Sequence, residues 1–254
     1  MIKFFRHIRQ RMLSENKMSK YLLYALGEII LVVIGILIAL SINNWNSDRQ
    51  LRVQEQEFLT SLKNEFSINL DLLNESIKEV DLQKQHIEAL LQLFDSNVSD
   101  NMSDSTIASL IYPVLSSYER YNPSTGVLTD VTGSGNLNLI LNKELRQDLA
   151  AFGTALHNLK SQESNSKANW KSLKDHYNKN GSVRNVMMSK GLTLSEHSIS
   201  EAVGYKNLFQ SLEFENLLLD HYLTTNSTNG PRFFLKVKGE IEQIIATIDQ
   251  ELLK

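Results

Sequence analysis

The stretch YLLYALGEIILVVIGILIALSI, residues Tyr21–Ile42, decides how this chain is built. Its 22 residues are apolar except for one ionisable side chain, Glu28. As a helix rising about 1.5 Å per residue, such a stretch is long enough to cross the hydrocarbon core of a bilayer. It is apolar on all sides and follows a basic cluster, which favours a membrane over the interior of a soluble protein. The sequence therefore predicts a transmembrane helix over residues 21–42.

The charges on either side of this stretch predict its orientation, because Lys and Arg are retained on the cytoplasmic side of a membrane. The 20 residues after it contain only Arg49 and Arg52 as basic side chains. Before it, a single acidic residue, Glu15, is outnumbered by Lys3, Arg6, Arg9, Arg11, Lys17 and Lys20. We therefore expect a cytoplasmic N-terminus and an extracytoplasmic body. Tyr21, Tyr24 and Trp45 fit the aromatic belts of the two interfaces.

A cleaved signal peptide is the alternative for this stretch, because Ala39-Leu40-Ser41 places small residues as a signal peptidase site does. A typical signal peptide, however, has an apolar region of about 7–15 residues. The apolar run here is longer, and a segment of 20 residues precedes it. We therefore favour an uncleaved anchor.

Glu28 needs its own explanation, since a carboxyl group at membrane depth is costly and usually marks a pairing or functional site. Helical periodicity places it on one face with Gly35 and Ala39, which form a small-xxx-small pattern. One interpretation is a packing face whose Glu28 meets a polar group on a partner span or on a second copy of the chain. The other is a protonated or snorkelling Glu near the cytoplasmic boundary.

The chain is expected to have three parts, of which the first is a basic amphipathic cytoplasmic segment over residues 1–20. Its apolar side chains share one side of a short helix, as in helices that lie on a membrane surface; they are Ile2, Phe4, Phe5, Ile8, Met12 and Leu13. The transmembrane helix over 21–42 and a helical body over 43–254 follow.

Composition excludes several classes of function. The 254 residues include no Cys, which rules out disulfides, thiolate metal sites and Cys nucleophiles. The net charge is −3 although the leading segment is basic, so the body is acidic. An acidic body argues against nucleic acid as a partner.

Heptad-like spacing predicts three long helices in the body. From Ile36 to Tyr112 there is neither Gly nor Pro, so one helix is expected from the membrane to about Asp95. Its apolar seam is Phe58, Leu62, Phe66, Leu70, Leu73, Ile77, Val80, Ile87, Leu91 and Phe94. A helix capped by Asn142 has a seam with two polar members: Leu145, Leu149, Phe152, Leu156, Leu159, Glu163, Ser166, Trp170, Leu173 and Tyr177. The last helix presents Phe234, Val237, Ile241, Ile244, Ile248 and Leu252.

Shorter features are expected between these helices. A further helix is predicted over 206–225, and two stretches, 96–105 and 181–200, are predicted to be irregular. Residues 106–119 are predicted to form a helix broken or kinked at Pro113. Residues 224–230 are predicted to form a turn that places Pro231 in the first turn of the last helix.

The stretch YERYNPSTGVLTDVTGSG, residues Tyr118–Gly135, is the richest irregular candidate, with a helical turn expected over 124–132. It could serve as a ligand loop at one end of the bundle, because its side chains offer both stacking and hydrogen bonds. The candidate ligand residues are Tyr118, Arg120, Tyr121, Asn122 and Asp130. The alternative, which we favour, is a structural connection rich in Pro and Gly.

Signals for catalysis or metal binding are weak. The six His residues are scattered, with no His-x-x-x-His pair, and solvated His on helix surfaces is the expected state. Two antiparallel helices could still bring His176 and His221 together. There is no G-x-S-x-G motif, and Gly133-Ser134-Gly135 lacks the Lys of a phosphate-binding loop. We therefore expect no catalytic residues, no metal and no cofactor.

Two stretches resemble a known family. MIKFFRHIRQRMLSENKMSKYLLYALGEIILVVIGILIALSINNWN at the N-terminus and YNPSTGVLTDVTGSGNLNLI at Tyr121–Ile140 are similar to a large family of single-span proteins of Bacteroidota, a domain of unknown function. The resemblance implies a Gram-negative inner-membrane protein with a helical periplasmic body. It brings no activity, cofactor or catalytic residue.

Together these observations predict an all-α protein: one transmembrane helix continuing into an extracytoplasmic antiparallel bundle of about four long helices. The expected function is that of a non-enzymatic scaffold or accessory subunit of an inner-membrane assembly. Its partners would be the bilayer and another membrane protein or further copies of itself. The alternative is a periplasmic module that binds or senses a small ligand, similar to the four-helix sensor bundles of chemoreceptors.

Overall fold

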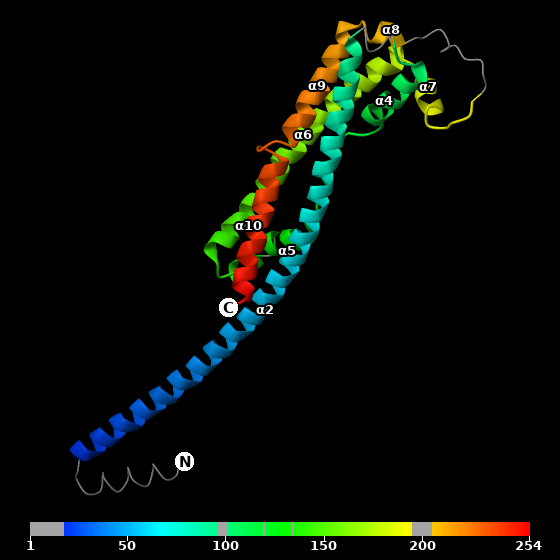
Figure 1. Ribbon diagram of the computed structural model, residues 1–254. Coiled ribbons are helices and arrows are strands. Elements are labelled where there is room, and N and C mark those ends of the chain that lie inside the picture. The colour runs from blue at the N-terminus through cyan, green and yellow to red at the C-terminus, as the bar shows by residue number, and fades with distance from the viewer. Residues whose placement is uncertain (1–17, 96–100, 119, 134, 195–204) are drawn as a thin grey trace. The chain divides into compact units, whose positions relative to one another are not determined.

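A computed structural model describes residues 18–95, 101–118, 120–133, 135–194 and 205–254 of the chain, and every regular element within these ranges is helical (Figure 1). Most of the expected amphipathic segment over 1–20 lies outside the described residues. The chain divides into two compact units, Met1–Gln56 and Glu57–Lys254. Each unit is described by itself below.

The first long helix, α2, runs over Met18–Leu91 for 74 residues, which confirms the expectation of one unbroken helix. It has no Gly or Pro after Gly35, so nothing in its sequence interrupts the backbone hydrogen bonding. A short 3-10 helix, η1 (Gln92–Phe94), follows directly, and at Asp95 the backbone becomes extended.

In the first unit, the large apolar side chains between Leu22 and Ile42 are exposed, each by 47–77%. Side chains of this size are normally removed from water, at a gain of about 25 cal/mol per Å² of buried surface. Among the described residues, this part of α2 is the one stretch long and apolar enough to cross a membrane.

The second unit is a helical bundle. Besides the bundle part of α2, its longer helices are, in chain order, α6 (Lys143–Asn180), α9 (Leu212–Thr228) and α10 (Phe234–Leu252). In Figure 1, α9 and α10 lie one after the other along α6. Their direction is opposite to that of α6, since Asn142 at its start bonds Glu251 and Asn169 in its second half bonds Asp220. The two helices therefore share one position in the bundle.

The bundle part of α2 is antiparallel to the same pair of helices. Lys63 forms an ion pair of 2.6 Å with Asp249 in α10, and Glu88 accepts a hydrogen bond of 2.8 Å from Tyr222 in α9. It follows that α2 and α6 are parallel to each other, and the chain must return along the bundle between them.

The part of the chain that runs back along the bundle, here called the return segment, consists of α4 (Asp104–Ser116), an irregular stretch, α5 (Gly126–Gly133) and the 3-10 helix η2 (Asn136–Leu139). It runs antiparallel to α2, because hydrogen bonds join Gln83 to residue 114, Ser76 to residue 120 and Asn69 to residue 124. The position beside α2 and α6 therefore contains two short helices and irregular backbone rather than a long helix.

The core consists of two apolar clusters. One contains Phe66 and Phe152, whose rings lie 5.0 Å apart, and the other contains Phe94 beside Phe209 at 5.3 Å. The three predicted seams supply most of the first cluster, which confirms the heptad assignment there. The second cluster takes Ile87, Leu173 and Tyr177 from the seams, and most of its members lie outside them. Glu163 and Ser166, the two polar members of the α6 seam, are also buried.

Several expected boundaries differ from the structure. Instead of one helix over 206–225, a short α8 (Tyr205–Leu208) precedes α9, because the Ser211 hydroxyl accepts from the N–H of Phe214 and starts a new helix there. The expected turn over 224–230 is helical as far as Thr228, and Pro231 precedes α10 rather than lying in its first turn.

Two further differences concern shorter segments. The stretch expected to be irregular over 181–200 contains α7 (Val183–Met188), capped by Ser182. Helix α4 continues through Pro113 to Ser116. Two expectations are confirmed: Asn142 caps α6, and α5 lies within one or two residues of the helical turn expected over 124–132.

Candidate functional site

The face of α2 around Glu28 is the first candidate. Glu28, Gly35 and Ala39 share one side of the helix, and a Cβ atom built on Gly35 would meet no atom within 4 Å. Next to Gly35 on this side, an open surface hollow is lined by Ala25, Glu28, Ile29, Val32 and Val33. Contact of this face with a partner helix stays a prediction.

The second candidate is the stretch Tyr118–Gly135, whose five predicted ligand side chains lie in different surroundings. The Tyr118 ring packs on Trp170 at a centroid distance of 5.2 Å, with the Lys167 ammonium 5.4 Å from the Tyr118 ring. Arg120, Asn122 and Asp130 are exposed, whereas Tyr121 is fully buried. Asn122 lies 3.5 Å from the Lys160 ammonium.

The irregular backbone of this stretch carries N–H and C=O groups that no helix satisfies, so they need other partners when buried. On the α2 side, the Asn69 amide donates to the carbonyl of Ser124 at 2.7 Å and accepts from the N–H of Ser124 at 2.8 Å. The Glu65 carboxylate accepts from the N–H groups of Val127 and Leu128 at the start of α5. A carboxylate suits this position because the N-terminus of a helix carries partial positive charge.

On the α6 side, Glu163 accepts a hydrogen bond of 2.6 Å from the backbone N–H of Tyr121. Lys160 pairs with Glu163 at 2.9 Å and also donates to the carbonyl of Tyr121. We call the four residues that hold this backbone, Glu65, Asn69, Lys160 and Glu163, the clamp.

Tyr121, whose backbone the clamp holds, has a fully buried side chain. Its ring lies 6.4 Å from that of Phe234, and its hydroxyl donates to the backbone carbonyl of Asn69 at 3.0 Å. Burial raises the pKa of Tyr121 well above its ordinary value of 10.0, so the hydroxyl keeps its proton at alkaline pH values where an exposed tyrosine loses it. Tyr121 therefore belongs to the core, and the clamp accounts for its place there.

Sequence reasoning missed the α2 half of this arrangement. Asn69, Ser76 and Gln83 recur at intervals of seven residues within the long α2 seam, and all three are buried. Each donates to a backbone carbonyl of the return segment, those of Ser124, Arg120 and Val114 respectively. The signal was present in the sequence, since three polar residues in heptad register interrupt one line of an apolar helix.

The histidines correct another expectation. His221 is fully buried rather than solvated, with its Nε2 atom 3.5 Å from the Gln83 amide nitrogen. His176 stacks on Phe214 with ring centroids 5.8 Å apart and lies 3.3 Å from Glu213. These two His residues therefore have different partners, and no group of metal-ligating side chains occurs among the described residues. The prediction for His221 was wrong because α9 buries a layer of polar side chains, and periodicity alone assigns polar side chains to the surface.

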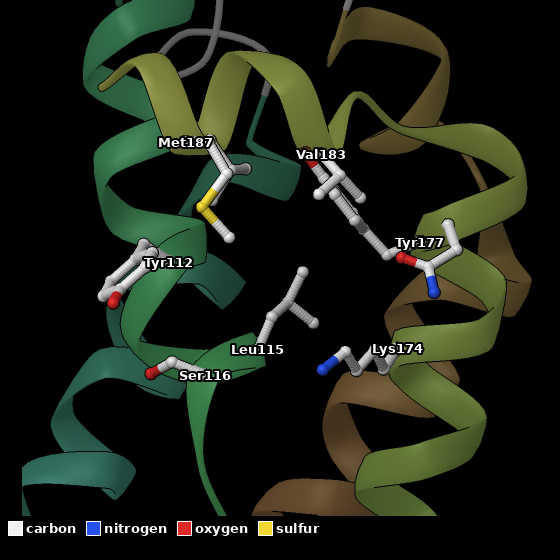
Figure 2. Close-up of a pocket in the computed structure, with 9 residues that line it drawn as sticks. Tyr112, Leu115, Ser116, Lys174, Tyr177, Val183 and Met187 are labelled. Carbon is white, nitrogen blue, oxygen red and sulfur yellow. The ribbon is translucent and has the colours of Figure 1, made fainter. Parts of the chain in front are cut away.

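A third candidate is a cavity of about 260 Å³ between α4, α6 and α7. Figure 2 shows Tyr112, Leu115 and Ser116 of α4 across from Lys174 and Tyr177 of α6, with Val183 and Met187 on the α7 side. The hydroxyl of Tyr177 donates to the carbonyl of Ser182 at 3.1 Å, which fixes the ring as a wall of the cavity. No residue of this cavity was among the predicted ligand residues.

These features define an all-helical protein with one apolar helix long enough to span a membrane and a bundle whose irregular segment is clamped from two sides. The chain belongs to a family of unknown function (DUF6090), whose model matches residues 28–216. The match begins at Glu28 and includes the whole clamp and every residue that lines the cavity. No curated protein and no solved structure matches the chain.

Proposed function

We infer that the protein is a membrane-anchored, non-enzymatic scaffold or accessory subunit of a bacterial inner-membrane assembly. Its N-terminus would lie in the cytoplasm and its bundle in the periplasm. It would associate through the Glu28 face with another membrane protein or with a second copy of itself. The observation that carries this proposal is the exposed apolar length of α2 between Leu22 and Ile42, which contains one carboxyl group beside a hollow.

Lipid would satisfy most of this surface but not all of it. Leucine, isoleucine and valine side chains are as well placed against acyl chains as against protein. A carboxyl group differs from them, because an acidic side chain at membrane depth costs several kcal/mol, roughly 2.5–3.5 in insertion experiments, and by default marks a functional site. Gly35 and Ala39 on the same face would let a second helix approach closely.

The bundle supports a structural role rather than a catalytic one. The buried carboxylates Glu65 and Glu163 accept hydrogen bonds from backbone N–H groups, so their acceptor positions serve the fold. Orientation rests on the basic side chains before residue 21, since such residues are retained on the cytoplasmic side.

Two glycines in the span provide a matched test. Gly35→Leu places bulk on the Glu28 face, and Gly27→Leu makes the same chemical change about 100° around the helix from Glu28. At both positions a Cβ atom would meet nothing within 4 Å, so both have open space where a side chain begins. Glu28→Leu removes the carboxyl group without adding bulk to Gly35.

The measurement is mass spectrometry on tagged full-length protein, purified in mild detergent from its native host at native expression level. Gly35→Leu and Glu28→Leu should each abolish a stable complex that the wild type and Gly27→Leu retain. If the complex survives both changes, or if the wild type purifies as a lone monomer, the proposal fails. A complex with a second membrane protein and a complex of identical chains would both support it and would identify the partner.

A further inference from the structure

The cavity between α4, α6 and α7 combines apolar walls with a few polar groups from α4 and α6. Its apolar lining comes from Leu115, Val183, Val186 and Met187. Its polar lining comes from Tyr112, Ser116, Lys174 and Asn178. Small-molecule sites have this composition: apolar walls that accept the body of a ligand and a few polar groups that orient it.

The size of the cavity restricts the ligand. About 260 Å³ lies just below the range of roughly 300–1,000 Å³ that is typical of ligand sites. A nucleotide or a long acyl chain exceeds this space. A molecule with a single ring or a short alkyl chain fits it.

The charge at the cavity is positive. None of the lining residues is acidic, and Lys174 extends its ammonium group from α6 toward α4 (Figure 2). The ammonium lies 4.6 Å from the centre of the Trp170 ring, and the Lys190 ammonium lies 4.8 Å from the centre of the Tyr112 ring. Among the described residues, neither lysine has a carboxylate partner. Both cations are thus held by aromatic faces and keep their hydrogen-bond donors for an anion.

The other polar groups lie on both α4 and α6, and two of them have a donor left for a ligand. Ser116 uses its proton on the carbonyl of Pro113 at 3.1 Å. The hydroxyl of Tyr112 and the amide of Asn178 make no hydrogen bond with another described residue. An ammonium, a phenol and an amide N–H together suit a carboxylate, which accepts hydrogen bonds and donates none.

We propose that this cavity binds a small amphipathic monocarboxylate, with the carboxylate at Lys174 and an aromatic or short aliphatic body against Leu115, Val186 and Met187. Contacts within the fold hold the walls of the site, since Tyr177 is fixed by Ser182 and the α7 helix that bears Val186 is capped by Ser182. The proposal is independent of the role of the membrane span. It differs from the candidate ligand loop at Tyr118–Gly135, none of whose residues lines the cavity.

The test uses full-length protein in lipid nanodiscs with the background change Trp45→Phe, which leaves Trp170 as the single tryptophan. Because Lys174 lies over Trp170, binding at Lys174 should change the Trp170 fluorescence. The probes are 3-phenylpropanoate, octanoate and the uncharged alcohol 3-phenylpropan-1-ol. At least one carboxylate should give a saturable change, and the alcohol should bind about tenfold more weakly or worse, since a charge-assisted hydrogen bond is lost.

Three variants locate the site. Lys174→Met keeps the length of the side chain but removes its charge, and should weaken carboxylate binding about tenfold. Val183→Phe adds a ring that fills the cavity and should abolish binding, with far-UV circular dichroism as the check on folding. Lys171→Met, one turn earlier on α6 and outside the cavity lining, is the matched control and should bind as the wild type does.

The outcomes separate cleanly. Saturable binding that depends on Lys174 but not on Lys171 supports the proposal, and the stronger of the two carboxylates identifies the ring or the chain as the preferred body. No saturable response to either carboxylate overturns it. Binding that Lys174→Met leaves unchanged, or an alcohol that binds as tightly as its carboxylate, overturns it as well.

Discussion

The carboxylate of Glu65 in α2 accepts a hydrogen bond of 2.8 Å from the backbone N–H of Val127, which lies 62 residues further along the chain. This contact joins the middle of the longest helix to the first turn of a helix of eight residues. A helix of that length is not stable alone, so its position depends on what holds its ends.

Replacing Glu65 by Leu is therefore expected to destabilise the bundle. The N–H groups of Val127 and Leu128 lose their acceptor, and each buried donor without a partner costs about 1–3 kcal/mol. Urea unfolding of the Trp45→Phe protein, followed by the fluorescence of Trp170, measures this loss. Glu65→Gln keeps one oxygen and should lose less.

The matched control for this prediction is Glu75→Leu, the same change on the same helix at an exposed position. It should alter the free energy of unfolding by no more than about 0.5 kcal/mol. Equal effects of Glu65→Leu and Glu75→Leu would show that the clamp contributes nothing to stability.

Tyr121→Phe should lower stability at neutral pH and flatten its decline in alkali. Loss of the hydrogen bond to the Asn69 carbonyl costs about 1 kcal/mol. Burial raises the pKa of the folded-state hydroxyl above its ordinary value of 10.0, so between these two values only the unfolded chain loses the proton. The stabilisation is thus complete below about pH 10 and is lost as the pH rises further.

The check is the free energy of unfolding as a function of pH, in wild type and in Tyr121→Phe. Above about pH 10 the wild type should lose up to about 1.4 kcal/mol per pH unit more than the variant. Parallel curves for the two proteins would contradict the assignment. Tyr177, whose pKa is also raised by burial, contributes to both curves alike.

Two glycines of the α6 region should respond in opposite directions to Ala. At Gly181 a Cβ atom would overlap the ring of Tyr177, which is fully buried and hydrogen-bonded to Ser182, so Gly181→Ala should destabilise the bundle. At Gly153, an exposed position inside α6, a Cβ atom meets nothing within 4 Å. Gly153→Ala should stabilise by about 0.5–1 kcal/mol.

Thermal unfolding followed by circular dichroism is sufficient for this pair. The backbone at Gly181 is extended, with φ −116°, so any loss in Gly181→Ala comes from the ring rather than from the backbone. A rise in melting temperature for both variants would mean that the Tyr177 ring moves aside without cost.

Asn142 has two roles, and two substitutions should separate them. Its side-chain oxygen accepts from the N–H of Leu145 to cap α6, and its amide donates to Glu251 of α10 at 2.7 Å. Asn142→Ala loses both bonds and should cost about 1–2 kcal/mol. Asn142→Ser keeps the cap but is too short for Glu251, and should cost less.

The free energy of unfolding decides the comparison, with Glu251→Gln as the third variant. Hydrogen bonds from Lys254 and Asn142 lower the pKa of Glu251, so its carboxylate form is favoured in the folded state. If Asn142→Ser and Asn142→Ala lose the same stability, the cap contributes nothing and the link to α10 accounts for the whole effect.

The long helices and the core could be predicted from the sequence because heptad spacing reports directly on burial. Phe66, Leu73, Val80 and Ile87 lie at intervals of seven, and all four are buried. The same rule found Glu163 and Ser166 as polar members of a buried seam. Local capping signals were equally readable, as Asn142 shows.

The polar line Asn69, Ser76 and Gln83 is visible in the sequence, but its partners could not be predicted. They are backbone carbonyls 31–55 residues away, in α4 and in the irregular stretch after it, and no rule of spacing connects them to α2. The residues around Tyr121 have the composition of a ligand loop, which does not predict burial. The contacts of the clamp explain why Tyr121 is buried. The cavity was equally hidden, since α4, α6 and α7 each contribute part of it.

The ion pair between Lys63 and Asp249 joins the bundle's first helix to its last. A ribosome synthesises the chain from the N-terminus, so α2 leaves the ribosome long before α10 does. The core cluster that contains Leu59 and Leu62 also contains Val237, Ile241 and Ile248 of α10, so it is complete only when nearly all of the chain has been made. Contacts of such long sequence separation slow folding and leave apolar surface open meanwhile.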